Sequence, residues 1–366
     1  MIFRFVNALF VDTNMPLKKI DYLPFLESCW QEHLQPKPDN APTLISTFAG
    51  CGGSSLGYSM AGFRELLAVE WDDNAVETFK LNFPDVPVYH GDICKLSVEQ
   101  VLEMTGLQLG ELDLFDGSPP CQGFSTAGKR QLDDPRNSLF REYVRLLRGL
   151  KPKVFVMENV SGMVKGVMKI VFAEIMRELK ASGYRVSARL LNAMYFNVPQ
   201  SRERMIFIGV REDLGIDPSH PEAESVPVMV REAFKNIKNH GDIQYPNGDC
   251  KAIVEEMRPG EDGCDAFQRI NQTTVGRWFG LKRLSFDRPA KTIVKSILSG
   301  QIHPSENRYL SESEIKRIAS FPDDYKFIGD LSEKWARIGN AVMPLFMRSI
   351  AKHIRANILD DCNTVN

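Results

Sequence analysis

The stretch DGSPPCQGFS, residues 116–125, follows a short apolar run at residues 112–115. The run predicts a buried strand, which Gly117 and the Pro119–Pro120 pair bring to an end. The two prolines fix φ and remove two backbone donors, so the loop after the strand should be stiff. Cys121 follows directly, at the carboxyl end of the strand, where open α/β sheets bind their ligands. A cysteine in that place is a candidate nucleophile, and a buried structural thiol is the alternative.

The composition is that of an ordinary folded protein. The 366 residues suffice for a large core and two domains, and 43% hydrophobic with 25% charged residues is typical of a globular chain. No apolar run approaches the roughly 20 residues of a membrane helix, and the N-terminus lacks a signal-peptide pattern. The seven cysteines form no CxxC pair and no cluster with histidine. We therefore expect a cytoplasmic protein with reduced thiols, no disulfide frame and no metal site.

A glycine-rich turn follows the first predicted strand. The apolar residues 44–48 lead into AGCGGSSLG at residues 49–57, and a helix should begin within that turn. A strand, a glycine-rich turn and a helix form the first unit of a nucleotide-binding doubly wound sheet. Glycines let the backbone approach a ligand, and the helix N-terminus offers free N–H groups. The spacing departs from GxGxxG, which argues against a dinucleotide.

Two more predicted strands end in side chains that could hold an adenosine. The strand at residues 66–69 runs into Glu70-Trp71, where an acid can bind ribose hydroxyls and a tryptophan can stack on adenine. The strand at residues 86–89 leads to Asp92, which could accept a hydrogen bond from an exocyclic amine. A solvated acid and a core tryptophan are the alternatives. Three such strand ends favour an adenosine-containing cofactor, and the absence of a P-loop motif argues against an NTPase.

Polar residues also flank the later strands. Residues 125–137 form a polar, basic segment that could clamp phosphates or could be a solvated loop. The strand at residues 154–157 ends in Glu158, at the same level of the sheet as Cys121, so that the two could act as proton donor and nucleophile. Arg202 and Arg204 precede the strand at residues 205–209, and we expect one of them to point into the site.

The charge divides sharply in the second half of the chain. Residues 212–265 contain 13 acidic and 5 basic residues, whereas residues 267–308 contain 8 basic and 2 acidic ones. In the basic stretch, cations such as Arg277, Lys282 and Arg283 alternate with aromatic and amide side chains. This pattern suits a nucleic-acid surface, and the sign asymmetry makes a merely solvated face the less favoured interpretation. The stretch should belong to a second domain.

Taken together and in order, these motifs resemble those of the DNA (cytosine-5) methyltransferases of bacterial restriction–modification systems. The resemblance covers roughly residues 43–360 and rests on FAGCGG at 48–53, EW at 70–71, GDI at 91–93, GSPPCQGFS at 117–125, ENV at 158–160, QSRER at 200–204, RYLS at 308–311 and GNAV at 339–342.

The resemblance implies an α/β fold: a doubly wound, mostly parallel, Rossmann-like sheet of the S-adenosylmethionine-dependent methyltransferase type, with a smaller target-recognition domain. Residues 1–42 would be an N-terminal extension without an assigned role, residues 43–211 plus 329–366 the catalytic and cofactor-binding domain, and residues 212–328 the target-recognition domain. S-adenosylmethionine is the implied cofactor. Its implied binding residues are Phe48, Gly50, Cys51, Gly52, Gly53, Glu70, Trp71, Asp92, Ile93, Pro119, Leu139, Asn340 and Ala341.

The family's chemistry assigns a role to each catalytic residue. Cys121 would add to C6 of cytosine and so activate C5, while Glu158 would hydrogen-bond N3 and the exocyclic amine. Arg204 would bind O2 of the base, and Arg202 would orient the acid. Because C5 is buried in a duplex, the cytosine must flip out of the helix. The base that removes the C5 proton is not identified. The predicted DNA contacts are Ser125, Lys129, Arg136, Arg277, Lys282 and Arg283.

Three alternatives remain open. A relative of this fold methylates transfer RNA, but its catalytic loop has proline where Gly123 stands here. A non-catalytic binding module is disfavoured by intact Cys121, Glu158 and Arg204. A nucleotide-dependent oxidoreductase would leave the Pro-Pro-Cys stretch without a role. The expected partners are duplex DNA and a restriction endonuclease acting on the same site, with the protein itself a monomer that is associated with the nucleoid through DNA.

Overall fold

A seven-stranded sheet forms the centre of the computed structural model, which describes residues 17–120, 138–164 and 168–360. The strand order is β3-β2-β1-β4-β5-β8-β6, and only β8 runs antiparallel to its two neighbours. The strands are β1 (Thr43–Thr47), β2 (Arg64–Glu70), β3 (Val88–His90), β4 (Leu114–Gly117), β5 (Val154–Val160), β6 (Tyr184–Asn192) and β8 (Glu203–Arg211). The predicted doubly wound, mostly parallel sheet is confirmed, and each predicted strand overlaps an observed one.

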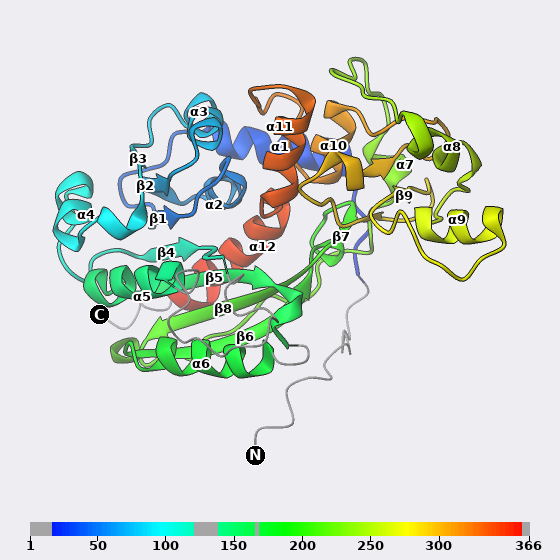
Figure 1. Cartoon of the computed structure of the whole chain (residues 1–366). Coiled ribbons are helices and arrows are strands. Elements are labelled where there is room, and N and C mark those ends of the chain that lie inside the picture. The colour runs from blue at the N-terminus through cyan, green and yellow to red at the C-terminus, as the bar shows by residue number, and fades with distance from the viewer. Residues whose placement is uncertain (1–16, 121–137, 165–167, 361–366) are drawn as a thin grey trace.

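Helices cover both faces of the sheet (Figure 1). The central strands are buried on both sides, so they are continuously apolar, and alternate residues face opposite cores. In β5, Val154 and Val156 pack into one hydrophobic cluster and Phe155 and Met157 into the other. The first cluster includes side chains of α1 (Tyr22–Leu34), α2 (Gly53–Met60), α3 (Asp73–Asn82) and α12 (Pro344–Ile354). The second includes side chains of α4 (Val98–Thr105), α5 (Ser138–Leu150) and α6 (Met168–Lys180).

The order of the strands creates a topological switch point between β1 and β4. From β1 the chain moves outward to β2 and β3, and it then returns to place β4 on the other side of β1. Ligands of open α/β sheets bind outside the carboxyl ends of the strands at such a point. The register pairs Thr47 at the end of β1 with Gly117 at the end of β4. The glycine-rich turn and the Pro-Pro-Cys loop therefore leave the sheet side by side.

The chain after β8 is far less regular. Its short elements lie beyond one end of the sheet in Figure 1. They are α7 (Val230–Ala233), α8 (Gly248–Glu256), α9 (Gly263–Asn271), β9 (Lys282–Arg283), β10 (Ala290–Lys291) and β11 (Gln301–Ile302). We call residues 212–308 the second lobe. β10 pairs with β7 (Gln200–Ser201), which fastens the lobe directly beside the QSRER stretch. The chain then returns through α10 (Glu312–Ile318) and α11 (Leu331–Asn340) to α12, followed by the single-turn helix Arg355–Leu359.

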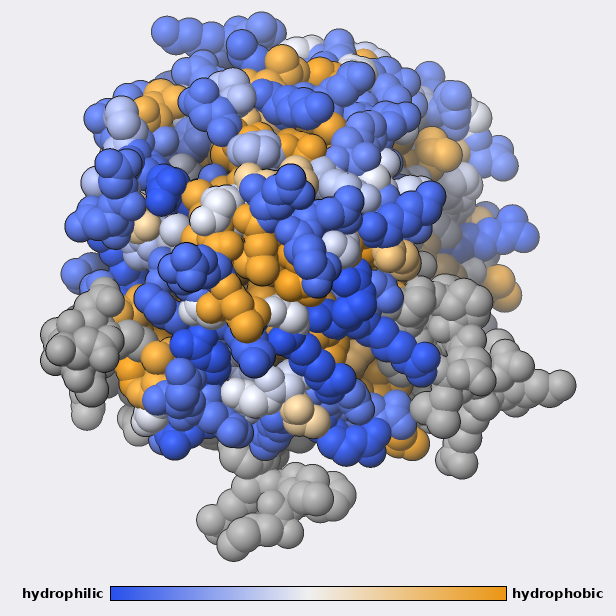
Figure 2. Space-filling view, turned by 90° about the vertical axis from the view of Figure 1, so that its left-hand side faces the viewer, coloured by the Kyte–Doolittle hydropathy of each residue, from blue (hydrophilic) through white to orange (hydrophobic). Residues whose placement is uncertain are grey.

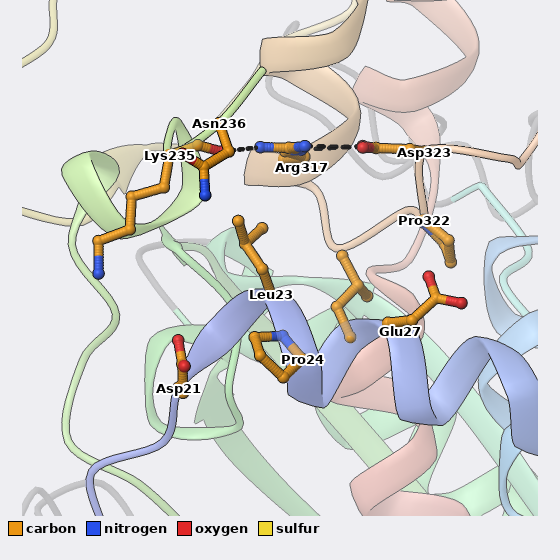
Figure 3. A pocket seen from close by; sticks show the side chains of 10 residues that line it. Asp21, Leu23, Pro24, Glu27, Lys235, Asn236, Arg317, Pro322 and Asp323 are labelled. Atoms are coloured by element: carbon orange, nitrogen blue, oxygen red, sulfur yellow. Dashed lines mark hydrogen bonds and ion pairs between the residues drawn. The ribbon is translucent and has the colours of Figure 1, made fainter. Parts of the chain in front are cut away.

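A hollow of about 540 Å³ lies between the start of α1, the segment after α7 and the end of α10. Figure 3 shows Arg317 spanning its wall, where it donates to the carbonyl of Lys235 and pairs with Asp323 at 2.7 Å. None of the predicted site residues that the structure describes lines this hollow. Since its main cation already has partners, we assign it no role in the reaction.

The exterior is mixed rather than uniformly polar. Seen from the side that carries α4, apolar side chains gather near the middle of the face and hydrophilic ones surround them (Figure 2). Among the described residues, no helix combines the length and the apolarity needed to cross a bilayer.

Candidate active site

The turn after β1 contains three residues in the left-handed region. Phe48 has φ +56°, Gly50 +56° and Gly52 +88°. A non-glycine residue at such a φ carries local strain, which is found most often at functional sites. A methyl group on Gly50 would meet nothing within 4 Å, so space remains open beside its backbone.

Gly52 and Gly53 are small for a different reason from the one expected. A Cβ on Gly53 would stand 2.3 Å from the carbonyl oxygen of Val342, and one on Gly52 would stand 2.6 Å from Phe83. These two glycines let other parts of the protein approach, whereas Gly50 faces open space. Tyr325 supports the same turn by donating to the carbonyl of Cys51. Burial raises the pKa of the Cys51 thiol to about 12, so this residue can contribute to a site only through its backbone.

Glu70 at the end of β2 organises the predicted cofactor edge. One carboxylate oxygen accepts from the Gly50 N–H at 2.8 Å, and the other accepts from the N–H groups of Trp71 and Asp72 at 2.9 and 3.0 Å. Glu70 is buried, and its Oε2 atom retains acceptor capacity for a ligand hydroxyl. Its neighbour Trp71 is 75% exposed, which is unusual for a tryptophan and leaves the ring accessible for stacking on a ligand.

The remaining predicted cofactor residues lie on adjoining segments. β3 pairs with β2, and the Gly91 N–H donates to the Glu70 carbonyl at 3.0 Å, which brings Asp92 and the buried Ile93 next to Trp71 in the sheet order. The backbone N–H of Cys94 lowers the pKa of Asp92, which therefore stays ionised and able to accept a hydrogen bond. Pro119 is buried, Leu139 and Ala341 are half-buried, and Asn340 is exposed at the end of α11.

Glu158 and Arg204 meet on one face of the sheet. In the antiparallel register Val160 stands opposite Arg204 and Glu158 opposite Ile206, so Glu158 and Arg204 are diagonal neighbours. Their Oε1 and Nε atoms are 2.5 Å apart, and both side chains are largely buried. The predicted pair of base-handling residues is therefore brought together, with the carboxylate one residue beyond the level of Gly117.

Arg202 does not touch the acid that it was expected to orient. Its buried guanidinium donates instead to three backbone carbonyls: Ile293 at 3.0 Å, Gly339 at 2.9 Å and Ala341 at 3.2 Å. Burial, and then the neighbouring Arg204, lowers the pKa of Arg202 to about 9. The expected contact with Glu158 is absent because the two terminal nitrogens donate to three carbonyls from distant segments, and a sequence does not display these carbonyls.

A buried polar cluster at the end of β4 was not foreseen. Asp116, directly before Gly117, accepts from the Tyr58 hydroxyl of α2 at 3.0 Å and is 3% exposed. Burial, with a contribution from the nearby Glu65, raises the pKa of Asp116 to about 8. Glu65, whose carboxyl accepts from Ser55 at 3.0 Å, has its own pKa raised to about 7 by burial. The one signal in the sequence is an acid at the end of an otherwise apolar strand.

Two further side chains that were not predicted hold the site together. The Asn159 amide donates to the Pro119 carbonyl at 3.1 Å and so fastens the Pro-Pro loop to β5. Arg337 of α11 pairs with Asp72 at 2.8 Å and links the end of β2 to the GNAV segment. Asn159 could have been found as the polar neighbour of Glu158, whereas nothing marks Arg337 in advance. Within the described residues, no group of three His, Cys, Asp or Glu is arranged to hold a metal ion.

The structure describes only some of the predicted DNA contacts. Ser125, Lys129 and Arg136 lie outside the described residues, as does Cys121 itself. Arg277 is exposed, with its guanidinium carbon 5.7 Å from the centre of the Phe267 ring.

Arg283 is corrected from a DNA contact to a structural residue. It is 4% exposed, and it donates to the carbonyls of His303, Glu306 and Val254 inside the second lobe. Lys282 is half-buried and pairs with Asp262 at 2.9 Å. Its charge is therefore already compensated within the lobe, which weakens the case for Lys282 as a contact.

The chain is similar to known proteins over most of its length. A sequence model of the family described as C-5 cytosine-specific DNA methylase matches residues 43–356. The type II methyltransferase M1.HphI of Haemophilus parahaemolyticus is 34% identical over 85% of this chain and 86% of its own. M.DdeI of Desulfomicrobium norvegicum is 33% identical over 87% and 91%.

Solved structures share the fold. A DNA modification methyltransferase encoded within an E. coli prophage superposes with a TM-score of 0.72 at 24% identity, over 87% of this chain and all of its own. The Spodoptera frugiperda DNMT2 structure gives a TM-score of 0.62 at 19% identity, over 88% and 100%.

Proposed function

Since the chain belongs to the C-5 cytosine-specific DNA methylases, we propose that it transfers a methyl group from S-adenosylmethionine to C5 of cytosine within a short site in duplex DNA. One observation carries the proposal. The cofactor turn after β1 and the Pro-Pro-Cys loop after β4 leave the sheet side by side at its switch point. Glu158 stands on β5, the next strand along, and pairs there with Arg204 of β8.

The cofactor edge fits S-adenosylmethionine in three respects. Gly50 has open space where a methionine moiety could approach, Glu70 keeps an acceptor for ribose hydroxyls, and the exposed Trp71 ring offers a face to adenine. Asp92 is ionised and could accept from the exocyclic amine. Bound there, the cofactor supplies an electrophilic methyl group. The protein residues supply position and the exclusion of water.

The residues of the base-handling edge divide the remaining chemistry. The Cys121 thiolate forms a bond to C6, and the proton that Glu158 provides goes to N3, so that electron density builds up at C5. Arg204 holds O2 of the base and at the same time orients Glu158, with which it is paired at 2.5 Å. After C5 carries the methyl group, a base removes the C5 proton, the sulfur–C6 bond breaks, Cys121 leaves as thiolate and the N3 proton returns to Glu158. Reaching C5 requires the cytosine to flip out of the duplex.

The second lobe would read the DNA. We assign target recognition to residues 212–328, which contain this lobe and α10, and cofactor binding with catalysis to residues 43–211 and 329–366. Among the predicted contacts of the lobe, Arg277 has the exposure that a phosphate contact requires. The relatives named above are type II methyltransferases, and we propose a restriction endonuclease of the same specificity as the functional partner of a monomeric enzyme.

Methyl transfer to DNA tests the proposal directly. The full chain is incubated with labelled S-adenosylmethionine and mixed-sequence duplex DNA, and the product is sequenced after bisulfite treatment. We expect label in DNA and protected cytosines within one short sequence context. The Cys121→Ser variant should bind the cofactor and transfer no methyl group. Transfer to RNA that equals or exceeds transfer to DNA would overturn the choice of substrate.

A further inference from the structure

Residues 293–295 are a short segment of the second lobe that lies against α11, beside the predicted cofactor segment Gly339–Ala341. This segment follows β10 and belongs to the lobe that the proposed function assigns to DNA. Three contacts hold it in place, one from Arg202 and two from α11. Arg202 donates to the Ile293 carbonyl, Trp335 donates to the Val294 carbonyl at 3.0 Å, and a Cβ on Gly339 would stand 2.6 Å from that same Val294 oxygen.

The same guanidinium reaches the cofactor side. While one Arg202 nitrogen donates to Ile293 in the lobe, the other donates to Gly339 and Ala341, which flank Asn340 in the predicted cofactor segment. Arg202 is 3% exposed, so these carbonyls share one enclosed cation. Moving either segment would leave buried carbonyls or N–H groups without partners, which costs more than the hydrogen bonds are worth in water.

The outer side of the segment faces solvent. Val294 is 43% exposed, and Lys295 and Ser296 are exposed as well. Lys295 forms no ion pair among the described residues, in contrast to Lys282 and Lys291, which both pair with Asp262. The segment thus exposes the Lys295 cation to solvent on one side, and on the other side it packs against α11 and Arg202.

We propose that Arg202 is a positioning residue that couples DNA binding to cofactor binding, by fixing the 293–295 segment of the lobe to the Gly339–Ala341 segment. The inference rests on the proposed function, which assigns the lobe to DNA, and on the predicted place of Asn340 and Ala341 in the cofactor site. A ligand that orders one segment also orders the other through Arg202. The second ligand then binds to a surface that is already ordered, so each should strengthen the other.

Reciprocal binding measurements test the coupling. The first probe is S-adenosylhomocysteine, which cannot transfer a methyl group. The second is an unmethylated duplex that contains the target sequence found by the bisulfite experiment. The DNA dissociation constant is measured with and without saturating S-adenosylhomocysteine, and that of S-adenosylhomocysteine with and without DNA. For each ligand, the ratio of the dissociation constant without the other ligand to the constant with it measures the coupling. In the wild type the two ratios should agree, because coupling is reciprocal, and each should reach about 5-fold or more.

Two variants weaken the junction by different means. Arg202→Lys keeps the charge but replaces the forked guanidinium by a single nitrogen, and Trp335→Phe removes the hydrogen bond to Val294 together with part of the buried ring. We expect both to reduce the ratio to less than about 2-fold, which is below the usual range of coupling. If Arg202→Lys does not fold, the coupling ratio of Trp335→Phe serves as the test. The matched control is Arg283→Lys, another buried arginine on three carbonyls, whose partners all lie within the lobe.

The control separates coupling from stability. Arg283→Lys should lower the unfolding midpoint as Arg202→Lys does, yet it should retain the wild-type ratio. A wild-type ratio of one, or an unchanged ratio in folded Arg202→Lys and Trp335→Phe, would overturn the coupling while leaving the proposed function intact. A wild type that binds neither probe would overturn both proposals.

Discussion

The strand ends of the sheet and the second lobe use charged side chains in opposite ways. At the strand ends, Glu70 and Asp116 are held by neutral donors, namely backbone N–H groups and a tyrosine hydroxyl. In the lobe the acid-rich and base-rich stretches neutralise each other. Arg269 pairs with Glu261, and Lys282 and Lys291 both pair with Asp262.

The difference shows what a charge imbalance in a sequence can and cannot mean. The excess of acid in residues 212–265 and of base in residues 267–308 resembled a nucleic-acid surface, but part of it is an internal set of ion pairs. A carboxylate without a cation, held at a strand end, is the more telling feature. Such a group retains acceptor capacity or an unusual proton affinity that a ligand can use.

The largest expected effect concerns Glu158. This residue lies at a strand end but pairs with a cation, Arg204, so it shares a feature with each of the two regions compared above. Glu158→Gln preserves the shape and removes the proton that N3 requires, so the methyl-transfer rate should fall about 10²- to 10⁴-fold. Single-turnover transfer at saturating DNA measures this effect. Binding of S-adenosylhomocysteine serves as the control and should be unchanged. A loss of less than tenfold would mean that Glu158–Arg204 is merely structural, like the pairs of the lobe.

A pair of glycine variants should separate protein packing from ligand space. Gly53→Ala forces a methyl group to 2.3 Å from the Val342 carbonyl oxygen, and such overpacking should lower the free energy of unfolding by about 1–3 kcal/mol. Gly50→Ala meets no protein atom within 4 Å but enters the space that we assign to the cofactor. It should weaken S-adenosylhomocysteine binding more than it weakens the fold.

Urea unfolding and calorimetric titration measure the two effects side by side. Since Gly50 has φ +56°, alanine there also carries a backbone cost of about 1 kcal/mol. The comparison is therefore between the two ratios of lost affinity to lost stability. Equal ratios would argue against open ligand space at Gly50.

The sequence allowed the strand ends to be predicted because local signals define them. Short apolar runs located the predicted strands, and the first polar residues after several of them became the predicted site, as with Glu70 and Glu158. Boundaries moved by a few residues: the strand expected at 112–115 is observed at Leu114–Gly117. Gly117 still ends it, as expected.

The roles of the buried arginines could not be predicted in this way. Arg202 donates to carbonyls 91, 137 and 139 residues away along the chain, and Arg283 to carbonyls 20 to 29 residues away. A sequence marks such residues as cations, and cations near a predicted site are interpreted as ligand contacts. Which carbonyls lack a partner depends on how irregular segments pack, and no period or motif encodes that.

A smaller effect should appear in the pH dependence of stability. Asp116 is buried without a basic partner among the described residues, and burial raises its pKa to about 8 from an ordinary value near 4. The folded state therefore holds a proton that the unfolded chain releases. The stability due to this group is present below pH 4 and is lost as the pH rises toward 8.

Asp116→Asn should flatten this decline. A pKa difference of one corresponds to about 1.4 kcal/mol, so the loss of unfolding free energy between pH 5 and pH 9 should shrink by about 1 kcal/mol or more. Urea denaturation across this range measures it. Glu65, whose pKa is raised to about 7, should leave a residual slope in the variant. Parallel wild-type and variant curves would show that Asp116 is ionised in the folded protein.

The smallest effect tests the lobe itself, through two cations that the sequence does not distinguish. Arg277 is exposed and stacks on Phe267, whereas Lys282 pairs with Asp262. If Arg277 contacts a phosphate, Arg277→Ala should reduce the slope of log affinity against log salt concentration by about 0.9. Lys282→Ala should change the slope by much less, because its charge is compensated inside the protein. Fluorescence anisotropy on one duplex across a salt series measures both. Equal changes in the two variants would mean that DNA displaces Lys282 from Asp262, and the internal pairs of the lobe would then be a resting arrangement that binding opens.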